Sequence, residues 1–231
     1  MADQDVAQDT IIKLKNITFA YPSGGEVFRG LDFQFPAGAR AGLIGHTGAG
    51  KTTLVQIIMG LLKPTSGQVE IFGSRRQKES DFREVRAKLG FLFQDADDQL
   101  FCPTVAEDVA FGPMNLGIPR HEVEIIVKET LDMLGLSDFE DRITYKLSGG
   151  EKRLVSLATV LAMKPEMLLL DEPATGLDVE TTDRLIQLLL QSELPYLIIS
   201  HDRDFLARTT TSSYRMNHGA IESGIDSSPL T

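Results

Sequence analysis

The sequence predicts an α/β fold, in which an antiparallel β layer comes first and a helical insertion at about residues 95–164 interrupts a core of buried strands. Three observations predict it. A glycine-rich segment, residues 45–52, separates an apolar run at 41–44 from a helical pattern at 53–59. Strand and helix patterns alternate around this unit. Between Asp95 and Lys164 the apolar residues recur at helical spacing instead.

Two strands are expected before the glycine-rich segment. Residues 11–21 and 27–35 alternate between apolar and polar side chains, and Pro22-Ser23-Gly24-Gly25 joins them as a turn. They form the predicted antiparallel layer. Later apolar runs indicate further strands at residues 68–72, 89–93, 167–170, 196–199 and 219–222, and we expect a loose tail from Ser223.

The helical insertion carries its own start and stop signals. Apolar residues from Val123 to Leu134 keep the helical period, with Pro119 near the start and Gly135 at the end. Two capping boxes, in which a serine or threonine is followed three residues later by a glutamate, predict further helix starts at Thr104 and Ser148.

Composition limits the classes of function. The chain has 231 residues, 42% of them hydrophobic, and a formal net charge of −10, which argues against a broad nucleic-acid surface. No apolar run approaches the roughly 18 residues that a membrane-spanning helix needs. The single cysteine, Cys102, fits a reducing compartment and is expected to be a packing residue rather than a catalytic thiol.

The glycine-rich segment has the spacing of a loop that wraps nucleotide phosphates. Its amides would face phosphate oxygens at the positive end of the following helix. Lys51 would reach the β- and γ-phosphates, and the Thr52 hydroxyl would ligate Mg²⁺. The alternative is a glycine-rich turn with a chance lysine. The predicted loop consists of Gly45, His46, Thr47, Gly48, Ala49, Gly50, Lys51 and Thr52.

A buried strand at residues 167–170 ends in two adjacent carboxylates. Asp171, at the strand tip, would hold Mg²⁺ directly or through water. Glu172 would accept a proton from the water that attacks the γ-phosphate. Two solvated acids at the end of a core strand are the alternative interpretation.

A second phosphate-binding device follows from Leu147-Ser148-Gly149-Gly150-Glu151. A serine and two glycines at a helix N-terminus offer a hydroxyl, exposed amides and a favourable dipole end. One nucleotide does not need two such cradles, so this helix end is expected to bind the γ-phosphate of a nucleotide held by a second copy or a homologue. A helix cap alone is the alternative, and the two roles are compatible.

At these residues the chain resembles the nucleotide-binding subunits of ABC transporters, over essentially its whole length and in the family's motif order. The resemblance implies one nucleotide-binding domain over residues 1–231, with a P-loop NTPase (RecA-like) core, ATP and Mg²⁺ as cofactors, ATPase activity and a head-to-tail dimer. It assigns an adenine-stacking role to Tyr21, a γ-phosphate contact to His201 and a place at the dimer seam to Asp178. By chemistry alone, Tyr21 could be an ordinary core or rim aromatic and His201 an ordinary surface or capping residue.

The resemblance thus completes three sets of candidate residues. The catalytic set is Lys51, Gln94, Glu172 and His201, and the metal set is Thr52, Gln94 and Asp171. The nucleotide-binding set is Tyr21, the loop residues Gly45 to Thr52, Thr53, Ser148, Gly149, Gly150 and Asp178.

The segment from Gln94 to Pro113 is similar to the ATPases of energy-coupling factor importers, and closest to their cobalt and nickel type. This implies an integral membrane partner and a peripheral position at the cytoplasmic face of the cell membrane. Leu100 and Phe101 would supply apolar anchors for that partner. The carboxylates of Asp95, Asp97 and Asp98 would suit a basic helix, or merely solvate a loop.

Other functions stay open on the sequence. A vitamin such as biotin is the alternative cargo. An ABC ATPase of repair or chromosome type would need a coiled-coil insertion longer than the interval between Gln94 and Ser148 allows, and translation-type members usually carry two cassettes. A P-loop kinase would explain Lys51 but neither the Ser148-Gly149-Gly150 segment nor the histidine after the last strand.

Overall fold

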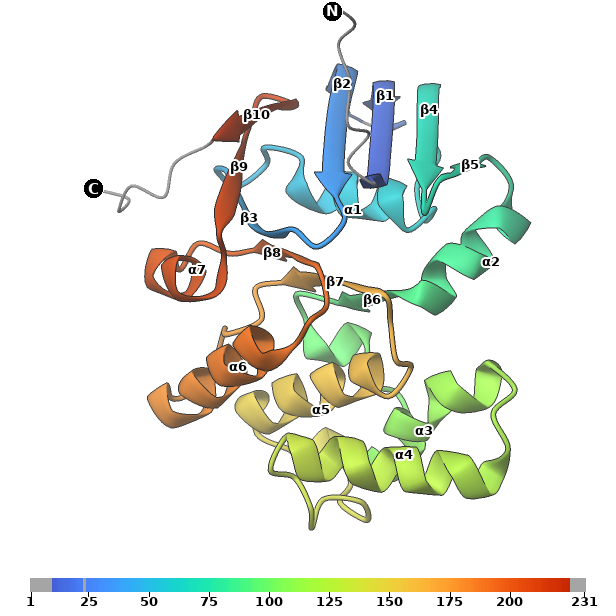
Figure 1. The fold of residues 1–231 in the computed structure, drawn as a ribbon, viewed down its shortest axis with the longest axis vertical. Helices are drawn as coiled ribbons and strands as arrows, with labels where there is room; N and C mark the ends of the chain where they lie inside the picture. Colours follow the sequence, from blue (N-terminus) through green and yellow to red (C-terminus); the bar gives the residue numbers. More distant parts are fainter. Residues whose placement is uncertain (1–9, 23, 225–231) are drawn as a thin grey trace, which may run out of the picture. The chain divides into compact units, whose positions relative to one another are not determined.

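The computed structural model describes residues 10–22 and 24–224, which form two compact units (Figure 1). Of the described residues, 10–22, 24–86 and 195–224 build the first unit, and Ala87–Leu194 builds the second. Each unit has its own sheet strands and helices. The predicted turn residue Ser23, and the predicted tail beyond Gly224, lie outside the described residues.

An antiparallel sheet in the first unit confirms the predicted β layer. Its strand order is β2-β1-β4-β5, and the first three strands run side by side in Figure 1. Alternate residues of β1 and β2, such as Leu14 and Phe33, are buried, so the two-residue period places one face on a core. The strands are β1 (Thr10–Ala20), β2 (Glu26–Pro36), β4 (Ser66–Ile71) and β5 (Ser74–Arg76).

Parallel strands in the same unit carry the glycine-rich loop. Strand β3 (Arg40–Ile44) pairs in parallel with both β8 (Tyr196–Ile199) and β9 (Ser212–Asn217). Helix α1 (Lys51–Ile58) follows the loop, and α7 (Arg203–Thr209) lies between β8 and β9. Strand β10 (Ala220–Gly224) pairs with β9, so the expectation of a loose chain from Ser223 is wrong for its first two residues, which belong to a ladder.

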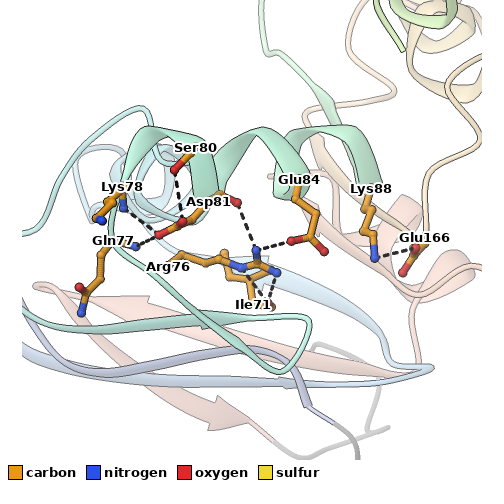
Figure 2. A network of polar contacts seen from close by, with 9 residues as sticks. All are labelled: Ile71, Arg76, Gln77, Lys78, Ser80, Asp81, Glu84, Lys88 and Glu166. Carbon is orange, nitrogen blue, oxygen red and sulfur yellow. Dashed lines mark hydrogen bonds and ion pairs between the residues drawn. The ribbon is translucent and has the colours of Figure 1, made fainter. Parts of the chain in front are cut away.

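Helix α2 (Glu79–Lys88) is anchored by a buried arginine that sequence patterns did not single out. Arg76 donates to the Ile71 carbonyl from Nε at 3.2 Å and from Nη2 at 3.0 Å, and to the Glu84 carboxylate at 2.6 Å (Figure 2). At the end of the same helix, Lys88 pairs with Glu166 at 3.4 Å. Arg76 thus contacts Glu84 in the middle of α2, and Lys88 at its end has an ion-pair partner.

The second unit is a parallel strand pair with helices. Strand β6 (Leu89–Leu92) pairs with β7 (Met167–Asp171), and α3 packs against α4 and α5 (Figure 1). A Cβ on Gly90 would lie 2.5 Å from Val160, so β6 and α5 approach more closely than any larger residue permits. The helices are α3 (Val105–Asn115), α4 (Arg120–Met133), α5 (Gly149–Leu161) and α6 (Val179–Gln191).

The predicted helix signals are confirmed. Thr104 and Ser148 are N-caps with complete capping boxes, Pro119 precedes α4, and Gly135 ends it in the left-handed region at φ +72°.

Candidate functional site

The glycine-rich loop is shaped by residues that need glycine. Gly48 and Gly50 have φ values of 81° and 107°, which L side chains rarely adopt. A Cβ on Gly45 would lie 2.5 Å from the carbonyl oxygen of Met216, so the loop runs directly against β9. Gly50 is the N-cap of α1 and supplies no side-chain cap. The amides of this helix end are therefore placed to bind an anion.

The Lys51 side chain is buried and folds back onto the start of the glycine-rich loop. Its Nζ donates to the carbonyl of Gly45 at 2.6 Å and to that of His46 at 3.2 Å, and the residue is only 9% exposed. The next two residues differ: the Thr52 side chain is exposed, whereas Thr53 is buried. The ammonium and the Thr52 hydroxyl are thus positioned at the start of the helix, as phosphate and metal contacts require.

Tyr21 lies directly after β1 and reaches α1. Its hydroxyl is 3.1 Å from Thr53 Oγ1, and its ring meets that of Phe19 edge to face at 5.0 Å. At 38% exposed, the ring retains a solvent-accessible surface. The predicted nucleotide-binding hydroxyl of Thr53 therefore has a partner within the protein, and the Tyr21 ring is held beside the helix.

His201 shares a pocket of about 380 Å³ with the start of the loop. Gly45, His46, Arg203 and Arg215 are among the lining residues. The structure thus brings His201 together with the first two residues of the predicted phosphate loop. Two arginines also line this pocket, and the sequence patterns gave no reason to select them.

The paired carboxylates occupy the end of β7 in the second unit. Asp171 is 4% exposed, and Glu172, the next residue, has φ +49°, in the left-handed region that a non-glycine residue seldom occupies. Such a conformation costs on the order of 1–3 kcal/mol and persists where the surroundings fix it. The strand end therefore presents two adjacent acids in a constrained turn.

The serine–glycine segment and Asp178 line the same pocket. Ser148, Gly150 and Asp178 line a common pocket of about 370 Å³, and a Cβ on Gly150 would lie 3.2 Å from the Gly176 carbonyl. Hydrogen bonds from the Ser148 amide and hydroxyl, both 2.8 Å, lower the pKa of Glu151. Asp178 caps α6 by accepting from the Thr181 amide at 2.8 Å, which lowers its pKa.

Gln94 begins the segment that leads from β6 to α3. Its side chain is exposed, while Gln99 braces the segment by accepting from the Phe93 amide at 3.1 Å and donating to the Ser156 carbonyl at 2.8 Å. The Gln94 side chain itself is exposed at the surface of the second unit.

The carboxylates after Gln94 have more internal contacts than we expected. Asp95 caps a short 3₁₀ turn, η1 (Ala96–Asp98), and Asp97 pairs with Lys152 at 2.6 Å. Two of the three acids predicted for a basic partner therefore have partners within the chain. Asp98 is also exposed.

Arg153 is a further residue that the sequence patterns did not single out. It is 4% exposed on α5, and Leu157 and Val160, which follow it at helical spacing, are buried, so a charge on this buried face is a signal that could have found it. Burial lowers the pKa of its guanidinium to about 10, and the nearby charge of Asp171 opposes that shift. Its N–H groups donate to the backbone carbonyl of Gln94, after β6, and to those of Glu172 and Pro173, after β7.

The donor set suits Mg²⁺ rather than a metal held by protein alone. Within residues 10–22 and 24–224, no three histidine, cysteine or acidic side chains gather around a common point. Mg²⁺ is usually held by one or two carboxylates, waters and substrate phosphates. The Asp171 carboxylate in the second unit and the Thr52 hydroxyl in the first are each an oxygen donor of the kind that Mg²⁺ accepts. Over the same residues, no helix has the length and apolar character to cross a membrane.

The chain is similar to proteins of known sequence or structure. The chain is 48% identical to a putative ABC transporter ATP-binding protein of Nitratidesulfovibrio vulgaris, covering 94% of this chain and 80% of that one. It is 45% identical to the energy-coupling factor transporter ATP-binding protein EcfA of Methanothermobacter thermautotrophicus, covering 91% and 69%.

Two solved structures are similar over nearly the whole chain. The structure of cbiO1 from Clostridium perfringens, part of the ABC transporter complex cbiONQ, has a TM-score of 0.81 at 31% identity, covering 93% of this chain and 87% of that one. The ATP-binding cassette MJ0796, in a dimeric post-hydrolysis state bound to ADP and Pi, has a TM-score of 0.86 at 26% identity, covering 94% and 98%.

The family assignment joins these likenesses to the site. Residues 28–175, more than half of the chain, match the ABC transporter family, and this range holds the phosphate loop, the serine–glycine segment and the paired carboxylates. The fold is accordingly the P-loop ATPase fold with an antiparallel sheet. The chain belongs to the ABC transporter family, and it is an ATP-binding ATPase subunit of that family.

Proposed function

We propose that this chain powers an importer of the energy-coupling factor type, with cobalt or nickel as the cargo. The observation that carries the proposal is the segment from Gln94 to Pro113, which resembles the corresponding segment of such ATPases. The 45% identity to a protein named EcfA, and the likeness to cbiO1 of the cbiONQ complex, support the importer type. The choice of metal rests on the segment alone.

We assign the catalytic roles as the motifs suggest. Lys51 and His201 bind the γ-phosphate, and Glu172 accepts a proton from the attacking water. Thr52, Gln94 and Asp171 would hold Mg²⁺, which would supply positive charge to neutralise the phosphates. The chain is one nucleotide-binding domain over 1–231, with a helical insertion at about 95–164.

Two copies, or this chain and a homologue, would close head to tail around two ATP molecules. Each site then takes Ser148, Gly149 and Gly150 from the opposite subunit, with Asp178 at the seam. The grouping of these residues in one pocket of the second unit supports a shared binding face. The likeness to a dimeric ATP-binding cassette supports the assembly.

An exposed aromatic pair is the proposed contact for the membrane partner. Phe101 is 65% exposed and Phe111 is 47% exposed, and their rings meet edge to face at 4.7 Å. Buried Asp108 holds the first of them by accepting from the amides of Phe101 at 3.0 Å and Cys102 at 2.9 Å, and from the Thr144 hydroxyl at 2.9 Å. Exposed aromatic side chains held in a fixed geometry are typical anchors of interfaces.

The proposal places the chain at the cytoplasmic face of the membrane, where it binds its integral partner and no nucleic acid. Affinity purification from membranes of the native host tests this. We expect an integral membrane protein and two ATPase subunits per complex. Replacing Phe101 and Phe111 by serine should release the partner, whereas replacing Ile125, exposed by 55% on α4, should not.

Uptake measurements decide the cargo. Cells with the complete transporter should accumulate labelled Co²⁺ or Ni²⁺, and Lys51→Ala should abolish that uptake while the exposed-site control Lys63→Ala retains it. Uptake of biotin alone would replace the metal with the alternative cargo. Co-purification of nucleic acid or a soluble acceptor, with no membrane protein, would overturn the transport function.

A further inference from the structure

The guanidinium of Arg153 connects two segments that lie far apart in the sequence. Its Nη1 donates to the carbonyls of Phe93 and Gln94, the latter at 3.2 Å. Its Nη2 donates to the carbonyls of Asp171 and Glu172, the latter at 2.6 Å. Both segments carry residues that we assign to catalysis.

Every one of these acceptors is a backbone carbonyl. A third donor, Nε, reaches the carbonyl of Pro173 at 3.3 Å, so the planar fork holds three consecutive residues, the last of β7 and the first two of the turn after it. Arginine is the one side chain with five N–H donors in a fixed plane, and lysine has three on a single flexible atom. The geometry therefore depends on arginine itself and not only on a positive charge.

Glu172 gains most from this arrangement. Its φ of +49° is unfavourable for a side chain with a Cβ, and the Arg153 bonds engage the carbonyls of residues 171, 172 and 173 around it. The burial of Arg153 excludes water that could replace these bonds. The arginine thus fixes the backbone from which the glutamate side chain projects.

The other end of the connection is helix α5. Ser148 is the N-cap of this helix, and Arg153 belongs to it, five residues further along the sequence. A displacement of the helix would therefore move the carbonyls that Arg153 holds. We propose that Arg153 is a positioning residue for hydrolysis, which fixes Glu172 and Gln94 relative to the helix that begins at Ser148. This inference rests on the proposed role of Glu172 as the base.

A comparison of binding with turnover tests it in the full chain. Arg153→Met should lower kcat for ATP hydrolysis on the order of 100-fold, because a catalytic group displaced by about 1 Å loses that much. The Kd for ATP, measured with a fluorescent analogue, should change by less than about threefold, because the phosphate loop is untouched. Arg153→Lys should fall between the two proteins in kcat. Arg120→Met, an exposed arginine on α4, is the control and should match wild type.

The double variant with Glu172→Gln separates the inference from the function on which it rests. If Arg153 acts mainly through Glu172, adding Arg153→Met to Glu172→Gln should reduce the residual rate by much less than the roughly 100-fold expected in the wild-type background, leaving only the share that passes through Gln94. Additive losses, or wild-type kcat in folded Arg153→Lys and Arg153→Met, would overturn the positioning role. If Arg153→Met does not fold, Arg153→Lys tests the positioning role by itself, and a wild-type kcat in that variant would overturn it. Undiminished hydrolysis by Glu172→Gln would instead refute the base assignment.

Discussion

The hydroxyl of Tyr21 lies 3.1 Å from the hydroxyl of Thr53, joining the end of the first strand to the helix that follows the phosphate loop. Thr53 is buried, whereas the Tyr21 ring is 38% exposed. The bond therefore orients an aromatic face without covering it. It also connects two residues of the predicted nucleotide-binding set.

Two substitutions at Tyr21 separate the ring from the hydroxyl. Tyr21→Ala should weaken ATP binding about tenfold, since base–aromatic stacking contributes ~1–3 kcal/mol. Tyr21→Phe keeps the ring and should stay within about threefold of wild type. Equilibrium titration with a fluorescent ATP analogue measures both, with Tyr145→Ala, 73% exposed in the other unit, as the control. Equal losses in both variants would assign the effect to the hydroxyl.

Glu172→Gln tests the general base. Removal of the carboxylate should lower hydrolysis by at least about 100-fold, the usual contribution of a positioned base, while ATP binding persists. ATP should then accumulate in a closed dimer, detectable by size-exclusion chromatography. Phosphate release measures the rate, and Glu129→Gln on the exposed face of α4 is the control. Unchanged turnover would remove Glu172 from the role of base.

Two serines of α5 should respond to alanine in opposite directions. Ser156 Oγ is fully buried and has no hydrogen-bond partner within the described part of the chain, so Ser156→Ala should raise the free energy of unfolding by about 1 kcal/mol. Ser148 caps the helix, so Ser148→Ala should lower it by about 1 kcal/mol. Urea denaturation at pH 7 compares the two. A loss of stability in Ser156→Ala would indicate that its hydroxyl has a partner in solution.

The Ser148 effect should depend on pH. Hydrogen bonds from Ser148 lower the pKa of the Glu151 carboxyl in the folded state. A depressed carboxyl pKa stabilises the fold above the unfolded value, about 4.3 for glutamate, and this contribution disappears as the pH falls through the folded-state pKa. The difference between wild type and Ser148→Ala should accordingly shrink below about pH 4. A difference that is constant with pH would contradict the charged capping box.

Cys102 should resist alkylation at neutral pH. Burial, reinforced by the charge of Asp108, raises the pKa of its thiol to about 11. Because the thiolate is the nucleophile, the reaction with iodoacetamide at pH 8 should be on the order of 100-fold slower than for the same chain unfolded in urea. The rate should rise with pH up to about 11. Equal rates in the folded and unfolded chains would contradict the raised pKa.

Local patterns sufficed for the phosphate loop, the two capping boxes and most strands. The loop spacing of Gly45 to Thr52 reports a backbone conformation that neighbouring residues create by themselves. Capping boxes close over three residues, and Ser148 and Glu151 form theirs as predicted. Strand β9 was missed because its exposed residues interrupt the apolar run on which a buried-strand prediction depends.

Contacts between residues far apart in the sequence could not be predicted from local patterns. Asp97 meets Lys152 across 55 residues, so a carboxylate that we expected to face a partner serves the chain itself. At this separation, no periodic pattern in the sequence indicates that the two residues form a pair. The positive φ of Glu172 is likewise an outcome of packing rather than of residue type.

The sequence by itself determined the α/β class, the ATP-binding family and the residue types available for phosphate and metal chemistry, because these follow from short-range spacing. Only the tertiary structure decided that Arg153 is buried against the two segments that carry the proposed catalytic residues of its unit and that the Tyr21 hydroxyl is held by Thr53. A buried guanidinium is stable only where folding supplies enough carbonyl acceptors. Those acceptors come from segments that the chain brings together only once it has folded.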